Sequence, residues 1–254
     1  MGNLEDVYNE KYKQGYRTAL TGYEYARWEA LRDFIKINIK STPLAVLDYG
    51  AGSGLHVKLW KQLFPTSKLF FADISEVAIN QLISTFPEVK GQTCIIKQNI
   101  TDFTNNSFDV IVSIEVMEHV DDLDGYLSEI KRILKPGGKF IWTTPCANRL
   151  SVEHIYSYSK GQIDKTDEGY RRWHWEEPTH LRRLRSIEIK SLLQKKGFSK
   201  VKFRFRAHFF SFVCTKLVEK RILPRKISNR LMKLDYRLFR RLPNAASMIG
   251  CATK

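Results

Sequence analysis

Four side chains of this sequence have the types and spacing for acid–base or metal chemistry. Glu115, Glu118 and His119 form an E-x-x-E-H array, and His180 follows later in the chain. We expect residues 115–120 to form a helix, on which positions three and four apart share a face. Two carboxylates and two imidazoles suit a borderline divalent cation, and an imidazole also serves as a general base without metal. The array therefore predicts a site that binds a metal ion or removes a proton.

A glycine-rich turn lies upstream of this array. Residues 47–54 are Leu-Asp-Tyr-Gly-Ala-Gly-Ser-Gly and directly follow an apolar run, which predicts a strand over 44–49 and a helix over 55–64. Glycines at such a turn let the backbone bend sharply and approach a ligand closely. Asp73 follows about 20 residues later, after a second expected strand, where a ribose hydroxyl pair would need an acceptor. The G-x-G-x-G spacing differs from the dinucleotide fingerprint and favours another nucleotide-type cofactor.

Expected strands and helices alternate along the chain, which predicts an α/β fold with a parallel sheet and helices on both faces. Before the first strand, Tyr25, Trp28, Leu31, Ile35 and Ile39 recur at steps of three or four, so we expect an amphipathic helix over 24–40. The expected strands are 44–49, 68–72, 93–97, 108–114, 138–144, 201–206 and 246–252.

Two further segments, 106–113 and 134–141, follow the glycine turn and Asp73 and complete a set of motifs. In this order and spacing the motifs resemble class I S-adenosylmethionine-dependent methyltransferases, over roughly residues 44 to 200. The resemblance implies a Rossmann-like, seven-stranded, mostly parallel sheet whose last strand runs antiparallel between the fifth and sixth. It also implies S-adenosylmethionine as cofactor, held by Asp48, Gly50, Gly52, Gly54, Asp73, Ile74, Asn99, Ile100 and Ile114.

The chain departs from the family pattern after the third expected strand. Many relatives have an acid there that contacts the adenine amine, whereas this chain has Asn99 and Ile100. Adenine recognition at that point is therefore expected to rest on a neutral side chain and on the backbone.

The E-x-x-E-H array resembles two branches of the family more closely. Ubiquinone-biosynthesis O-methyltransferases carry it after the fourth strand with a later Thr-His, here Thr179-His180, and small-RNA 2'-O-methyltransferases use a similar set; both are metal-assisted. This resemblance implies Glu115, Glu118, His119 and His180 as metal ligands. Two alternatives remain: Glu118, His119 and His180 line a metal-free catalytic pocket, or they have no direct role.

Length and composition predict one domain over residues 1–254, whose 43% hydrophobic content is enough for a full core. Its expected regions are an N-terminal cap over 1–43, a cofactor-binding core over 44–147, an aromatic-rich substrate lid over 148–185 and a basic amphipathic insertion over 207–243. Tyr8, Tyr12 and Tyr16, with Arg27, are candidates to close over the cofactor's carboxylate. Four widely spaced cysteines and a polar first segment predict a cytoplasmic protein with free thiols and no membrane span.

The positive charge is concentrated in one part of the chain. Residues 200–243 contain 14 Lys or Arg against 2 acids, while the whole chain has a formal charge of +15. Ile227, Leu231, Leu234 and Leu238 form a stripe at helical spacing within this insertion. The insertion could pack this stripe on the domain with its charges solvated, lie on anionic lipid, or bind nucleic acid.

These features predict a methyltransferase that O-methylates a lipid-linked, glycan or secondary-metabolite acceptor at or near a membrane, as a peripheral protein. An RNA 2'-O-methyltransferase is the first alternative. A non-catalytic cofactor-binding protein is the second, and the intact glycine turn with its acid pair, Asp48 and Asp73, argues against it.

Overall fold

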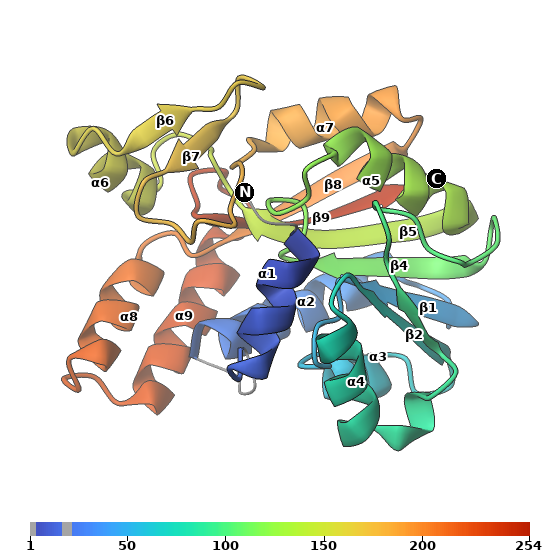
Figure 1. The fold of residues 1–254 in the computed structure, drawn as a ribbon. Coiled ribbons are helices and arrows are strands. Elements are labelled where there is room, and N and C mark those ends of the chain that lie inside the picture. Colours follow the sequence, from blue (N-terminus) through green and yellow to red (C-terminus); the bar gives the residue numbers. More distant parts are fainter. Residues whose placement is uncertain (1–3, 17–21) are drawn as a thin grey trace.

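The computed structural model describes residues 4–16 and 22–254, so positions 1–3 and 17–21 of the expected cap region lie outside the described residues. A seven-stranded sheet runs through the molecule in the order β3-β2-β1-β4-β5-β9-β8 (Figure 1). The last strand, β9, runs antiparallel between β5 and β8, as predicted. The strands are β1 Ala45–Tyr49, β2 Lys68–Asp73, β3 Thr93–Ile95, β4 Phe108–Ile114, β5 Leu134–Pro145, β8 Ser199–Arg206 and β9 Ser247–Thr253.

Two apolar cores lie on opposite faces of this sheet. Val46 of β1 belongs to one core and its neighbour Leu47 to the other, and Val110 and Ile111 of β4 divide in the same way. Successive residues of a strand point to opposite faces, so a strand covered on both sides must be apolar throughout. The core that contains Leu47 lies under two helices, α5 Leu123–Ile133 and α7 Ser186–Lys195. The core that contains Val46 lies under α2 Gly22–Asn38, α3 Val57–Leu63 and α9 Arg225–Phe239.

The helix predicted over 24–40 is α2. Leu31 and Ile35 are buried against the sheet, Trp28 and Ile39 are partly buried, and the side chain of Tyr25 is outside what the structure describes. The helix predicted over 55–64 is α3. Near the amino end, α1 Leu4–Lys13 contacts α4 Glu76–Thr85, which is followed by the short 3-10 helix η1 Pro87–Val89.

The helix predicted over residues 115–120 is absent. The segment forms a turn, and the helix begins only at Leu123, where the Asp122 side chain accepts a hydrogen bond from Gly125 N at 2.9 Å. Glu115 has a backbone φ of +55°, which is incompatible with a right-handed helix. The N-cap preference of aspartate thus places the cap at Asp122, seven residues after Glu115, and the first helical residue at Leu123.

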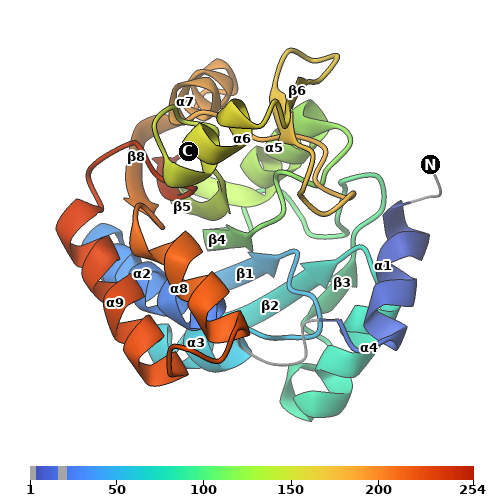
Figure 2. The ribbon, with the colours of Figure 1, turned by 90° about the vertical axis from the view of Figure 1, so that its left-hand side faces the viewer.

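The expected substrate lid contains elements that the sequence did not reveal. It holds α6 Val152–Ser159 and a small hairpin formed by β6 Ile163–Lys165 and β7 Arg171–Trp173. The basic insertion forms a pair of helices, α8 Phe210–Glu219 and α9, and α9 lies against α2 (Figure 2). Among the described helices, none is long and apolar enough to cross a bilayer.

Candidate active site

The glycine turn has the geometry that its sequence implied. Gly50 has φ +86° and Gly52 has φ +55°, a region in which side chains with a β-carbon are strained. A β-carbon at Gly50 would collide with Val116, and one at Gly52 would collide with the Tyr12 hydroxyl. The turn is fixed to the second strand, since the N–H groups of Gly50 and Ala51 donate to the carbonyl of Ala72 at 2.7 and 3.0 Å.

Asp73 is held in place at the end of β2. Its carboxylate accepts hydrogen bonds from Gly52 N at 2.8 Å and from Ser75 N at 2.9 Å. Burial raises the pKa of Asp73, and these backbone donors oppose that effect. The side chain is therefore oriented by the glycine turn itself and lies at the wall of the neighbouring pocket.

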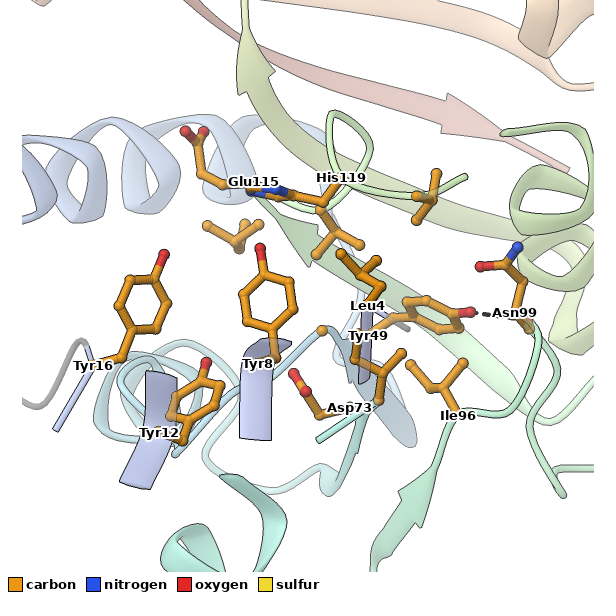
Figure 3. A pocket seen from close by; sticks show the side chains of 15 residues that line it. Leu4, Tyr8, Tyr12, Tyr16, Tyr49, Asp73, Ile96, Asn99, Glu115 and His119 are labelled. Atoms are coloured by element: carbon orange, nitrogen blue, oxygen red, sulfur yellow. Dashed lines mark hydrogen bonds between the residues drawn. The ribbon is translucent and has the colours of Figure 1, made fainter. Parts of the chain in front are cut away.

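A pocket opens at the carboxyl ends of β1, β2 and β4 (Figure 3). Five of the predicted cofactor residues line it: Gly50, Asp73, Ile74, Asn99 and Ile114. Tyr49, Ile96, Val116 and Val120 are further lining residues that sequence reasoning did not single out. Asn99 is held near the wall because the Tyr49 hydroxyl donates to its carbonyl at 2.9 Å.

Four predicted cofactor residues do not line this pocket. Asp48 lies beneath the turn, where Trp60 Nε1 donates to its Oδ2 at 2.6 Å, and burial raises its pKa to about 7. Gly52 bonds to Asp73, Gly54 faces Leu82, and the side chain of Ile100 is 60% exposed. Asp48 and Gly54 therefore pack behind the turn, whereas Gly52 faces the Tyr12 hydroxyl.

Tyrosines of the amino-terminal segment close one side of the pocket. Tyr8 and Tyr12 project from α1 and Tyr16 from the turn after it, and all three line the cavity (Figure 3). The Tyr8 ring lies edge-on to His119, with centroids 5.8 Å apart. Arg27, predicted to join them, instead pairs with Glu115, its Nη2 lying 3.1 Å from Glu115 Oε2.

The two glutamates of the array are held on different sides of β5. Thr143 Oγ1 donates to Glu115 at 2.7 Å, and Thr144 Oγ1 donates to Glu118 at 3.0 Å. Since consecutive strand residues point to opposite faces, the two threonines draw the carboxylates apart. Glu115 joins Arg27 on the α2 face, and this separation excludes it from the group around Glu118.

Glu118, His119 and His180 do come together. Each offers a ligand atom, and these atoms lie within 4.8 Å of one another. The two imidazole rings have centroids 4.6 Å apart, and His119 Nδ1 lies 2.9 Å from the Thr179 carbonyl. Glu118 Oε1 is buried and has no hydrogen-bond partner among the described residues. Burial and the charge of Glu115 raise the pKa of Glu118 well above its usual range.

Glu176 positions His180, and sequence reasoning missed it. Its Oε1 lies 3.2 Å from His180 Nδ1 and also accepts from Arg183 Nε at 2.6 Å. Burial alone would lower the pKa of His180, but the hydrogen bond that its ring donates to Glu176 and the charge of Glu118 outweigh burial, so the pKa is raised. The E-x-x-x-H spacing of Glu176 and His180 was the one sequence feature that could have indicated this contact.

The aromatic side chains of the expected lid do not line this pocket. Trp173 is fully buried, with its ring 4.8 Å from the Arg183 guanidinium carbon, while Tyr158 is 75% exposed. Trp175 is partly exposed, and its indole N–H donates to Ser157 at 2.8 Å. In this structure the segment therefore supports Arg183 and Glu176 behind His180.

Comparisons with known proteins agree with this geometry. A family model described as a methyltransferase domain matches residues 21–202. A probable S-adenosylmethionine-dependent methyltransferase of Mycolicibacterium smegmatis is 28% identical over 155 residues, covering 60% of this chain and 51% of that protein. A ubiquinone/menaquinone biosynthesis C-methyltransferase of Desulfotalea psychrophila is 27% identical over 117 residues, covering 44% and 47%. The chain thus spans about half the length of these curated relatives.

Among solved structures, a phosphoethanolamine N-methyltransferase of Haemonchus contortus with bound S-adenosylhomocysteine superposes with a TM-score of 0.61. It is 15% identical, and the match covers 100% of this chain and 61% of that one, which shows a shared fold. The chain belongs to the methyltransferase-domain family. The curated relative in Mycolicibacterium smegmatis is named as a probable S-adenosylmethionine-dependent enzyme of this kind.

Proposed function

We propose that this enzyme transfers the methyl group of S-adenosylmethionine to a hydroxyl group of a lipid-linked, glycan or secondary-metabolite acceptor. The observation that carries this proposal is the buried group of Glu118, His119 and His180 beside the cofactor pocket. The pocket residues would hold the cofactor, with Asp73 accepting from the ribose hydroxyls. Of the proteins named above, one is named a C-methyltransferase and one an N-methyltransferase, so the choice of oxygen rests on the chemistry of this group.

A hydroxyl acceptor needs a base more than an amine does. The sulfonium methyl is already electrophilic, so the enzyme has to align the acceptor oxygen with the methyl and the sulfur and then remove the hydroxyl proton. His180 suits this task because Glu176 fixes the Nδ1 side of its ring and directs the other nitrogen to the group of Glu118 and His119. Its raised pKa makes it a stronger base.

The same three residues fit a divalent cation. The Glu118 oxygen that lacks a partner among the described residues and the two imidazoles form a mixed donor set that suits a borderline metal, and both rings are oriented through Nδ1. A metal bound there would lower the pKa of the acceptor hydroxyl. Glu115 would not contribute, because Arg27 and Thr143 hold it on the other side of β5.

We further propose that the α8–α9 pair seats the enzyme on an anionic membrane. Of the predicted apolar stripe on α9, Ile227, Leu234 and Leu238 face outward, and Leu238 is 62% exposed. The helix instead buries Ser228, Met232, Asp235 and Tyr236 toward the domain. Three of the four stripe residues therefore form an exposed apolar surface, and Leu231 is half-buried. Ile222, at the tip between the helices, is 65% exposed and extends this surface.

Basic side chains surround this apolar surface. Lys233 and Arg240 turn inward and form ion pairs with Glu29 and Asp33 of α2. Four others are exposed on α9 itself: Arg225, Lys226, Arg230 and Arg237. Exposed apolar residues bordered by cations suit an interface of acyl chains and anionic headgroups, where each Lys or Arg contributes about 1 kcal/mol.

The function is tested with purified enzyme, S-adenosylmethionine labelled in its methyl group, and a cell extract divided into lipid, soluble and RNA fractions. We expect labelled product in the lipid fraction or on a soluble glycan or metabolite, with the label on oxygen. Label in RNA at a ribose 2'-oxygen would instead establish the nucleic-acid alternative. Tight cofactor binding without label in any fraction would support the non-catalytic alternative.

A further inference from the structure

A second buried group lies at the active edge of the sheet, on the α2 face. Arg206 is the last residue of β8, and β8 runs parallel to β5 because both pair antiparallel with β9. The carboxyl end of β8 therefore lies at the same edge as Glu115 and the end of β4. The Arg206 guanidinium carbon lies 4.1 Å from the centroid of the Tyr23 ring, and that of Arg27 lies 5.3 Å from the same centroid.

This group is short of negative charge. Arg206 and Arg27 are each 3% exposed, and Arg27 pairs with Glu115. Within the described part of the chain no ion pair joins Arg206 to an acid, and its Nε and Nη2 have no hydrogen-bond partner, nor has Nε of Arg27. Residues 17–21, which are outside the described part of the chain, contain no acid.

A buried guanidinium that lacks partners is costly, because its donors have lost water without gaining acceptors. The guanidinium is also the group best matched to the two oxygens of a carboxylate or phosphate. A ligand anion would therefore satisfy the free donors of Arg206 and balance the second positive charge. The Tyr23 ring packs against the guanidinium, with its centroid 4.1 Å from the guanidinium carbon.

Arg206 itself lies away from the cofactor pocket, whereas Arg27 pairs with Glu115, which lines that pocket. In the strand order β1-β4-β5-β9-β8, its strand lies three places from β4, roughly 14 Å at the usual strand spacing. The cofactor pocket lies over β1, β2 and β4, and Arg206 is not among its lining residues. An anion at Arg206 would thus lie on the far side of β5 from the adenosine-binding residues, toward α8 and α9.

We propose that Arg206, flanked by Arg27, forms a subsite for an acidic group, a carboxylate or phosphate, carried by the methyl acceptor. This inference rests on the proposed function in that it assigns the anion to the acceptor. The acceptor would then be held through its anion on the α2 face of β5, while its hydroxyl meets His180 on the other face.

The test measures anion binding without turnover. Full-length protein saturated with S-adenosylhomocysteine is titrated with inorganic phosphate or acetate at constant ionic strength, and the unfolding midpoint is followed. The variants are Arg206→Gln and, as a matched control, Arg204→Gln, which removes a partly buried arginine two residues away on the same strand. At 20 mM anion we expect the midpoint to rise by about 2–6 °C for wild type and Arg204→Gln.

For Arg206→Gln we expect a rise below about 1 °C, and in anion-free buffer an unfolding midpoint equal to or above that of wild type, because an unpaired buried charge is gone. If that variant does not fold, Arg206→Lys keeps the charge but loses the planar fork, and its anion response should weaken about tenfold.

The proposal is overturned if anion does not raise the unfolding midpoint of wild type, or if it still raises that of Arg206→Gln. It is also overturned if the midpoint rises only without S-adenosylhomocysteine, because the anion would then occupy the place of the cofactor's carboxylate. Absence of O-methyl product in the extract assay would contradict the proposed function and leave this binding result standing.

Discussion

Glu176 Oε1 lies 3.2 Å from Nδ1 of His180, and the carboxylate is fixed in turn by Arg183. This contact decides which nitrogen of His180 faces Glu118 and His119. It also keeps a negative charge beside the ring, so protonation of His180 is stabilised. Glu176 is therefore a positioning residue whose removal should change the pH dependence of the reaction.

Replacing Glu176 by glutamine should lower the pKa of His180, because the substitution removes the charge that raises it. A base works when deprotonated, so wild-type activity should fall as pH drops through a pKa above the ordinary value near 6.5. In Glu176→Gln this acidic limb should move to lower pH, with a lower plateau kcat. The pH profile of kcat checks this, and a reduced plateau with an unmoved limb would indicate a merely structural role.

His180→Gln should reduce kcat by about 10²- to 10⁴-fold, the usual contribution of a general base, while cofactor affinity stays unchanged. The matched control is His174→Gln, since His174 is half-exposed and pairs with Asp164 outside the pocket. If His180 accepts the proton directly, EDTA should leave wild-type turnover intact. Loss of activity in EDTA, restored by a divalent cation, would instead establish the metal-assisted reaction.

Asp73→Ala should weaken S-adenosylmethionine binding by about ten- to hundredfold, because charge-assisted hydrogen bonds contribute roughly 1.5–3 kcal/mol. Asp73→Asn keeps the shape and separates the loss of charge from any disturbance of the glycine turn. Asp124→Ala, an exposed acid on α5, serves as the control. Calorimetry on folded protein measures the affinities, and an unchanged value for both Asp73 variants would remove Asp73 from the cofactor site.

Substituting glutamine at Arg225, Lys226, Arg230 and Arg237 should weaken binding to phosphatidylserine vesicles by roughly 10²- to 10³-fold, at about 1 kcal/mol per charge. Lys233 and Arg240 are left in place because they pair with α2. The control removes four exposed charges elsewhere: Lys90, Lys190, Lys195 and Lys200.

Co-sedimentation at increasing salt measures the vesicle binding, and wild type should be released as salt rises. Equal losses in the two quadruple variants would mean that net charge, and not the α8–α9 surface, attracts the lipid. Replacing Leu238 by serine separately tests the apolar stripe and should weaken vesicle binding without changing cofactor affinity.

The sequence alone determined the parts of this protein that depend on local patterns. Apolar runs and glycine spacing predicted the seven main strands and the turn at Gly50, because strand burial and a left-handed backbone both restrict the residues at those positions. The second expected strand likewise predicted that Asp73 lies at its carboxyl end, where the structure has it. The sequence did not predict the hairpin of β6 and β7, because strands of three residues are too short to show a hydrophobic alternation.

Only the tertiary structure decided how the chemical groups are combined. Thr143 and Thr144 separate Glu115 from Glu118, so an array that looked like one ligand set became two groups on opposite faces of β5. Most of the apolar stripe of α9 is exposed because the helix buries Met232, Asp235 and Tyr236 instead, and Lys233 and Arg240 pair with acids of α2. Such contacts join residues up to 207 positions apart in the chain. A local sequence pattern does not show which strand or helix face will contact such a residue.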